Sequence, residues 1–191
     1  MAHKFDPSRA DRLLSPDRLR ILPPDVLLDE LAPRAGEVAA DIGCGPGFLT
    51  LPLAERLAPD GWVWACDIAP EMLVRLRERL SAAECRNVAP VLSAESLVPL
   101  PDGGCDLLLL VHMLHELEAP EAFFSEMRRL LRSGGRGLAV DWSPEPSPFG
   151  PPLAVRVPPE RASTWISAGG LAVEHVAPAG PHAYAIRFHK P

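Results

Sequence analysis

The feature that most restricts the fold of this chain is a short apolar run that leads directly into a glycine-rich turn. Residues 38–42 read Val-Ala-Ala-Asp-Ile, and glycines follow at alternate positions, Gly43, Gly45 and Gly47. An apolar run of this length bounded by glycine is typical of a buried strand. Glycine has no Cβ, so such a turn lets the backbone approach a bound molecule closely. The spacing differs from the G-x-G-x-x-G of a dinucleotide phosphate turn.

Beyond this turn, strand-like and helix-like segments alternate along the chain. Strands are predicted at 62–67, 88–92, 105–111, 137–140, 171–176 and 184–189, and helices at 48–57, 70–82, 120–131 and 160–168. Alternation of this kind requires right-handed crossovers and places helices on both faces of a parallel sheet. We therefore predict an α/β fold with a doubly wound, mostly parallel, seven-stranded sheet whose last strand is antiparallel.

Polar side chains gather where the predicted strands end. In doubly wound sheets, ligands bind beyond the carboxyl ends of the strands, where the strand order reverses. The residues at or just after strand ends are Asp41, Asp67, Glu95, His112 and Asp141. Their common position predicts a single site at this edge of the sheet.

Local signals set several of the predicted boundaries. Ser15 precedes Pro16, which is typical of a capping hydroxyl followed by proline at the first helical position. Residues 132–135 contain two glycines and are expected to stop the 120–131 helix. Residues 143–159 are rich in proline and predict a stiff loop.

Together these motifs resemble class I S-adenosylmethionine-dependent methyltransferases, in particular the small single-domain members that act on small molecules. The first motif of that family is an acid followed by G-x-G-x-G, as in residues 41–47. Residues 99–106 resemble the P-x-P-D-x-x-x-D approach to its fourth strand. Residues 132–136 resemble its K-P-G-G turn before the fifth strand, with serine in place of proline. The resemblance covers 38–141, and it implies a Rossmann-like fold.

The resemblance also implies S-adenosylmethionine as cofactor and S-adenosylhomocysteine as product. The glycine turn would hold the methionine part, and Asp41 would reach its ammonium directly or through water. Asp67 would accept hydrogen bonds from both ribose hydroxyls, although an NAD enzyme uses the same geometry. The alternative for Asp67 is a plain loop acid or helix cap.

After the third strand, the sequence departs from the family pattern. Ser93 stands where the family usually has aspartate, so Glu95 or a backbone group would meet the adenine; a surface role for Glu95 is the alternative. The complete set of predicted cofactor-binding residues is Asp41, Gly43, Cys44, Gly45, Gly47, Asp67, Ile68, Ala94, Glu95 and Val111.

The segment His112-Met113-Leu114-His115-Glu116 follows the fourth strand. Its H-x-x-H-E order is not the zinc motif H-E-x-x-H, and no third ligand is evident, so no metal is predicted. The resemblance implies a histidine here between cofactor and acceptor. A weakly acidic acceptor would also need a base, from His115, Glu116 or Asp141. We predict His115 and Glu116 as catalytic; the alternative is a polar, solvent-facing helix start.

Composition restricts the partners and the location. The net charge of −6 argues against an extended nucleic-acid surface. No apolar run approaches the ~20 residues of a membrane span, and the N-terminus lacks a signal-peptide core, so we expect no membrane partner and a cytoplasmic location. Arsenic methylation, known in related sequences, would need grouped thiolates. The cysteines are instead far apart and form no C-x-x-C pair: Cys44, Cys66, Cys85 and Cys105.

A length of 191 residues suits one domain. We expect an N-terminal helical cap (1–35), a cofactor-binding core (36–142), and a C-terminal part with the proline-rich loop, a helix and a closing strand pair (143–191). The expected function is S-adenosylmethionine-dependent methyl transfer to a small-molecule acceptor.

Two other functions remain open from the sequence. An NAD-dependent oxidoreductase is disfavoured by the glycine spacing, and because Tyr184, the sole tyrosine, lies inside a late predicted strand. A non-catalytic, methyltransferase-like subunit that binds cofactor for a partner is the second alternative.

Overall fold

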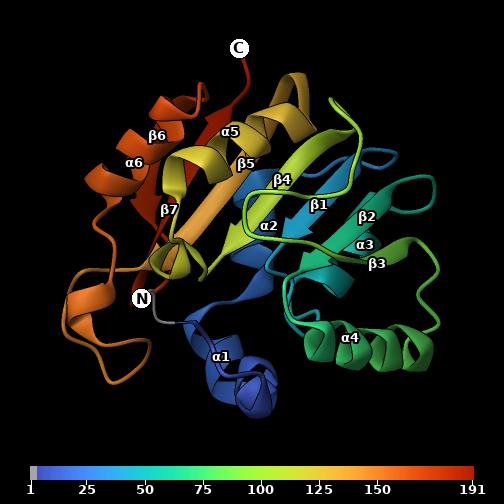
Figure 1. Ribbon diagram of the computed structural model, residues 1–191. Coiled ribbons are helices and arrows are strands. Elements are labelled where there is room, and N and C mark those ends of the chain that lie inside the picture. The colour runs from blue at the N-terminus through green and yellow to red at the C-terminus, as the bar shows by residue number, and fades with distance from the viewer. Residues whose placement is uncertain (1–3) are drawn as a thin grey trace.

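The computed structural model describes residues 4–191, and a seven-stranded sheet runs through its centre in the order β3-β2-β1-β4-β5-β7-β6 (Figure 1). The strands are β1 (Val38–Ile42), β2 (Trp62–Asp67), β3 (Val88–Leu92), β4 (Cys105–Val111), β5 (Leu131–Trp142), β6 (Ala172–Pro178) and β7 (Ala183–His189). β7 pairs antiparallel with both β5 and β6, whereas the other neighbours are parallel. This confirms the predicted mostly parallel sheet with an antiparallel last strand.

The strand order reverses at the centre of the sheet. β1 pairs with β2 on one side and with β4 on the other, so the chain moves outward in one direction through β3 and then in the other direction from β4. The connections after β1 and β4 therefore diverge, which leaves a crevice at the carboxyl ends of these two strands.

Helices cover both faces of the sheet. They are η1 (Pro7–Leu14), α1 (Pro16–Ile21), α2 (Pro24–Leu31), α3 (Thr50–Leu57), α4 (Pro70–Ala82), η2 (Leu114–Glu116), α5 (Pro120–Leu130), η3 (Leu153–Val155) and α6 (Pro159–Ala168). Buried side chains of α2, α3 and α4 share one core cluster, and those of α5 and α6 share the other. Every α-helix except α3 begins at a proline, whose fixed φ suits the first helical position.

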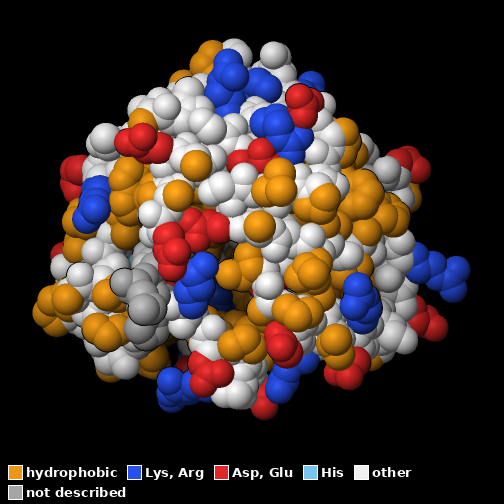
Figure 2. Space-filling view, in the orientation of Figure 1, with side chains coloured by type: hydrophobic (Ala, Val, Ile, Leu, Met, Phe, Trp, Pro, Cys, Tyr) orange, Lys and Arg blue, Asp and Glu red, His pale blue; other side chains and the backbone are white. Residues whose placement is uncertain are grey.

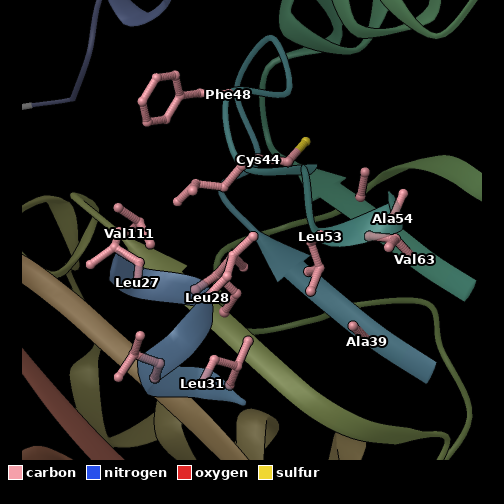
Figure 3. Close-up of a cluster of buried hydrophobic side chains, with 14 of the residues drawn as sticks. Leu27, Leu28, Leu31, Ala39, Cys44, Phe48, Leu53, Ala54, Val63 and Val111 are labelled. Carbon is pink, nitrogen blue, oxygen red and sulfur yellow. The ribbon is translucent and has the colours of Figure 1, made fainter. Parts of the chain in front are cut away.

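The core on the α2 side reaches the glycine turn. Leu27, Leu28 and Leu31 lie on one side of α2 and pack together with Ala39 of β1 and Leu53 of α3 (Figure 3). Cys44, Phe48 and Val111 belong to the same cluster, at the end nearest the turn (Figure 3). Packing of this core therefore fixes where the turn sits.

The structure corrects one predicted boundary. Helix α5 ends at Leu130 without a glycine stop, because Leu131 is already extended and pairs with Cys105 as the first residue of β5. The register shifts between the Cys105–Leu131 pair and the Leu107–Arg136 pair. The two glycines of 132–135 thus lie in an irregularity inside β5, which begins earlier than the predicted 137. The Ser15 cap is confirmed, since its hydroxyl accepts a hydrogen bond from the Arg18 N–H at 3.3 Å.

A close contact between β5 and β7 gives a test of this packing. Gly137 lies opposite Phe188, and a Cβ on Gly137 would come within 2.3 Å of the Phe188 Cζ. We expect Gly137→Ala to lower the free energy of unfolding by about 1–3 kcal/mol, because the buried ring has to move. Urea denaturation measures this loss, and the double variant Gly137→Ala with Phe188→Leu should recover much of it.

Candidate functional site

A cavity of about 410 Å³ opens at the carboxyl ends of β1, β2 and β4. Its walls come from the glycine turn, from the segments that follow β2, β3 and β4, and from the N-terminal segment. This volume lies in the range of small-molecule sites, and its place at the reversal of strand order matches the predicted location. Of the predicted cofactor-binding residues, the cavity brings together Gly43, Cys44, Gly45, Asp67, Ile68, Ala94, Glu95 and Val111.

The glycines of the turn divide into two roles. All three have positive φ, at 73°, 53° and 85° for Gly43, Gly45 and Gly47. Gly43 and Gly45 line the cavity. Gly47 lies outside the cavity wall, and a Cβ there would be 2.5 Å from the Leu76 Cδ1 of α4. The structure therefore shows a packing role for Gly47, and its contact with a ligand stays a prediction.

Asp67 connects the end of β2 to the glycine turn. Its Oδ2 accepts a hydrogen bond from the Gly45 N–H at 2.8 Å, and its Oδ1 accepts one from the Ala69 N–H at 2.9 Å. Burial raises the pKa of Asp67, and these backbone hydrogen bonds oppose the rise. Because an ionised carboxylate has about four acceptor positions, both oxygens can still accept from a ligand hydroxyl. The hydrogen bonds that Asp67 accepts from the backbone before α4 are thus compatible with the predicted ligand contact.

Asp41 lies beneath the turn and outside the cavity wall. It is 4% exposed, and its Oδ2 accepts a hydrogen bond from the Thr50 hydroxyl at 2.6 Å. Burial raises the pKa of Asp41 to about 7, with a smaller contribution from the charge of Asp67, against the opposing effects of Thr50 and Arg18. Of the two predicted routes to a ligand ammonium, this position suits the one through water.

The raised pKa of Asp41 predicts a pH-dependent stability. In the unfolded chain the carboxyl has a pKa near 3.9. Between about pH 4 and pH 7, Asp41 is therefore ionised in the unfolded state but still largely protonated in the folded state. The stabilising contribution is present below that range and is lost as the pH rises. We expect Asp41→Asn to raise stability by about 1–3 kcal/mol at pH 8 relative to its effect at pH 4. Urea denaturation across this range measures it, and a constant difference would contradict the prediction.

Glu95 is already engaged by the protein. Its Oε1 accepts hydrogen bonds from the N–H groups of Glu118 and Ala119 at 2.8 and 2.9 Å, and its Oε2 pairs with Lys4 Nζ at 3.3 Å. Burial opposes ionisation, but these hydrogen bonds and Lys4 outweigh it and lower the pKa of Glu95. Glu95 therefore joins the loop after β3 to the N-terminal segment and to the start of α5. Ser93 and Ala94 line the cavity beside it.

A second cavity, of about 440 Å³, adjoins the first. Five residues line both: Phe5, Leu13, Arg18, His112 and Glu116. Its remaining walls come from η1 and α1, from His115 and Trp142, and from residues 148–151 of the proline-rich loop. Figure 1 shows α1 and this loop at the same end of the sheet, although they are far apart in the sequence.

His115 lines the second cavity, where Asp141 holds its ring. The His115 Nδ1 lies 2.8 Å from the Asp141 Oδ1, and the His115 backbone N–H donates to the Asp141 Oδ2 at 2.9 Å. Because a carboxylate accepts hydrogen bonds, Nδ1 carries the hydrogen and Nε2 is left as the basic nitrogen, 3.7 Å from the Glu116 Oε1. Burial would lower the pKa of His115, but Asp141 and Glu116 outweigh it and raise the pKa. Glu116 lines both cavities, and burial raises its pKa.

Two residues of the shared wall, His112 and Arg18, were given no catalytic or cofactor-binding role from the sequence. Both ring nitrogens of His112 and the Nε of Arg18 are buried without a hydrogen-bond partner among the described residues. The His112 ring stacks on Trp142 with centroids 4.1 Å apart, and the Arg18 guanidinium carbon lies 4.9 Å from the Phe48 ring centroid. Burial lowers the pKa of Arg18 to about 10 and holds that of His112 well below its usual value, so Arg18 is charged and His112 neutral at pH 7. The position of His112 directly after a predicted strand indicated that it lies near the site. Nothing in the sequence around Arg18 indicated this.

Within residues 4–191, no three His, Cys, Asp or Glu side chains are grouped so that they could hold a metal ion. In the same range, the helices are too short or too polar to cross a membrane.

Comparison with known proteins agrees with this geometry. A family model described as a methyltransferase domain matches residues 40–139. A SAM dependent methyltransferase from Aquifex aeolicus superimposes with a TM-score of 0.93 at 28% identity, covering 97% of this chain and 98% of that one.

Curated relatives match over shorter stretches. The ubiquinone/menaquinone biosynthesis C-methyltransferase UbiE of Cupriavidus taiwanensis is 33% identical over 110 residues, which is 58% of this chain and 45% of that protein. The arsenite methyltransferase of Halobacterium salinarum is 29% identical over 139 residues, 73% of this chain and 34% of that protein. The matched region is thus less than half of each relative. Because the family model covers more than half of the chain and the sheet has the expected topology, the chain belongs to the class I S-adenosylmethionine-dependent methyltransferase family.

Proposed function

We propose that this protein transfers the methyl group of S-adenosylmethionine to a small-molecule acceptor and releases S-adenosylhomocysteine. The observation that carries the proposal is the pair of adjoining cavities at the reversal of strand order, one beside the glycine turn and one beside His115. Two cavities with a common wall suit a reaction in which one group passes between two bound molecules.

The donor and acceptor groups of the first cavity fit such a cofactor. Asp67 offers carboxylate oxygens for the ribose hydroxyls, and Ile68 and Val111 offer apolar walls for the adenine. Arg18 brings a buried cation with an unpaired N–H, which complements the carboxylate of the methionine part. When bound, the cofactor supplies an electrophilic methyl group on a sulfonium. In this proposal Ala94 and Glu95 flank the adenine, and Gly43, Cys44 and Gly45 support the methionine part.

In the second cavity, His115 serves as the base for an acceptor that loses a proton. Its Nε2 takes the proton, and Asp141 stabilises the resulting imidazolium through the hydrogen bond to Nδ1. Glu116 lies close enough to Nε2 to add a second favourable charge. Asp141 thus acts as a positioning residue, and His115 as the group that meets the acceptor.

The alternative functions receive less support. The Tyr184 hydroxyl donates to the Val157 carbonyl at 2.9 Å and lines neither cavity, so it is not placed to assist a hydride transfer. A non-catalytic role leaves the orientation of His115 by Asp141 without a purpose. Arsenite as acceptor is disfavoured because burial raises the pKa of Cys66 and Cys105, and neither lines the second cavity.

A small-molecule acceptor is also preferred to a nucleic acid. The face shown in Figure 2 mixes acidic, basic and apolar side chains and carries no broad basic surface. Phosphate backbones are bound through clustered cations. We therefore assign the acceptor role to a molecule that fits the second cavity.

Replacing Asp67 tests the cofactor assignment. We expect Asp67→Ala to weaken S-adenosylhomocysteine binding by about 10- to 100-fold, because a charged hydrogen-bond acceptor is lost. Titration calorimetry with S-adenosylmethionine, S-adenosylhomocysteine and NAD side by side measures this. Asp60→Ala, in the exposed turn before β2, is the matched control. Tight NAD binding, or an unchanged affinity in Asp67→Ala, would contradict the assignment.

A further inference from the structure

We propose that the second cavity selects small organic acids, in which an apolar body carries a carboxylate or phosphate group bound by arginines of the N-terminal segment. The proposal rests on the proposed function, since it treats this cavity as the acceptor side, and it names the chemical class of the acceptor.

The charged residues that line the second cavity include more cations than anions. Three arginines face it, Arg9, Arg12 and Arg18, together with two acids, Asp17 and Glu116. The chain as a whole has a net charge of −6, so this cavity differs in sign from the protein around it. A cleft lined by one sign of charge raises the local concentration of ligands of the opposite sign.

The ion pairs of these residues leave the positive charge of the cavity largely uncompensated. Within the described chain, no carboxylate lies within ion-pair distance of Arg9, Arg12 or Arg18, whereas Asp17 is paired with Arg20, which does not line the cavity. Arg9 and Arg12 therefore keep their donors available for an anionic ligand in this cavity, whereas Arg18 also faces the first cavity, where the proposed function assigns it to the methionine carboxylate.

The other walls define the rest of the acceptor. Trp142, Phe149 and Leu13 supply apolar surface to the same cavity. Because Arg12 and His115 line the same cavity, one molecule can place its acidic group at Arg12 and an ionisable hydroxyl at the His115 Nε2. Of the two cavities, Arg9 and Arg12 line only the second, whereas Arg18 lines both. Arg12 is thus the residue that separates acceptor binding from cofactor binding.

Pairs of an acid and a neutral analogue test the proposal. The full chain is saturated with S-adenosylhomocysteine and titrated with 4-hydroxybenzoate and 4-hydroxybenzamide, and with phenyl phosphate and phenol. We expect each acid to bind about tenfold more tightly than its neutral partner, the size of one charge-assisted hydrogen bond. Arg12→Gln should remove most of this preference. Arg86→Gln, which deletes an equal charge at an exposed position outside the cavity, should keep it.

The outcomes separate this proposal from the proposed function. If no acid binds more tightly than its neutral partner, or if Arg12→Gln and Arg86→Gln behave alike, the acid-binding role is wrong. In that case, intact binding of S-adenosylhomocysteine leaves the methyltransferase assignment standing. Preference for the phosphate over the carboxylate, or the reverse, identifies which anionic group the arginines accept.

Discussion

Replacing His115 with alanine is expected to lower kcat by about 10²- to 10⁴-fold for an acceptor that must lose a proton. The reason is that Asp141 fixes the tautomer and the orientation of the His115 ring, so a water molecule that replaces the imidazole has neither its basicity nor its position. Release of S-adenosylhomocysteine with hydroxylated acids as acceptors measures the loss. The affinity for S-adenosylhomocysteine should stay within about twofold of the wild type, because His115 does not line the first cavity.

The pH profile distinguishes a base from a structural residue. The pKa of His115 is raised above its ordinary 6.5, and only the neutral imidazole can accept a proton. The wild-type rate should therefore rise with pH through an apparent pKa above 6.5. In Asp141→Asn the charge that raises the pKa is removed, so the midpoint should move to lower pH while kcat falls. A profile that has the same midpoint in both proteins would exclude the proposed pair.

The fold could be predicted because its signals are local and agree with one another. Alternating apolar runs, prolines at helix starts and glycines at turns all favoured the same parallel sheet. The start of β5 is the instructive exception. Gly134 and Gly135 follow a helix and so match a helix stop, but the same two glycines also permit an irregular strand. Pairing of Leu131 with Cys105 decides between these, and that contact joins residues far apart in the sequence.

The site was predictable to the extent that it follows strand ends. Asp67 could be placed from its own segment, because parallel strands bring their carboxyl ends to one edge. Gly47 shares the positive φ of its neighbours, and only the position of Leu76 on α4 shows that it faces the core. Arg18 comes from a helix outside the resemblance, and the position of α1 at the end of the sheet brings it to the cavity (Figure 1). Such contacts depend on tertiary packing rather than on local pattern.

Replacing Gly45 with valine is expected to abolish cofactor binding, with affinity for S-adenosylhomocysteine reduced by roughly 100-fold or more. Gly45 has φ 53°, where a β-branched residue is strained by about 1–3 kcal/mol, and its N–H holds Asp67 in place. A Cβ there would lie 3.4 Å from the Leu13 Cδ1, so the added methyl groups would enter the cavity. The substitution therefore removes space for the ligand and also disturbs Asp67, the proposed ribose contact. Titration calorimetry measures the affinity.

Gly36→Val is the matched control for this loss. Gly36 also has positive φ, at 85°, but no atom lies within 4 Å of its expected Cβ, and it is outside both cavities. It should share the cost in stability and keep the affinity for S-adenosylhomocysteine. Urea denaturation of both variants corrects for strain, so that any difference in affinity reports the cavity alone. If Gly45→Val binds as tightly as Gly36→Val, the glycine turn does not hold the methionine part, and the first cavity binds its ligand in another way.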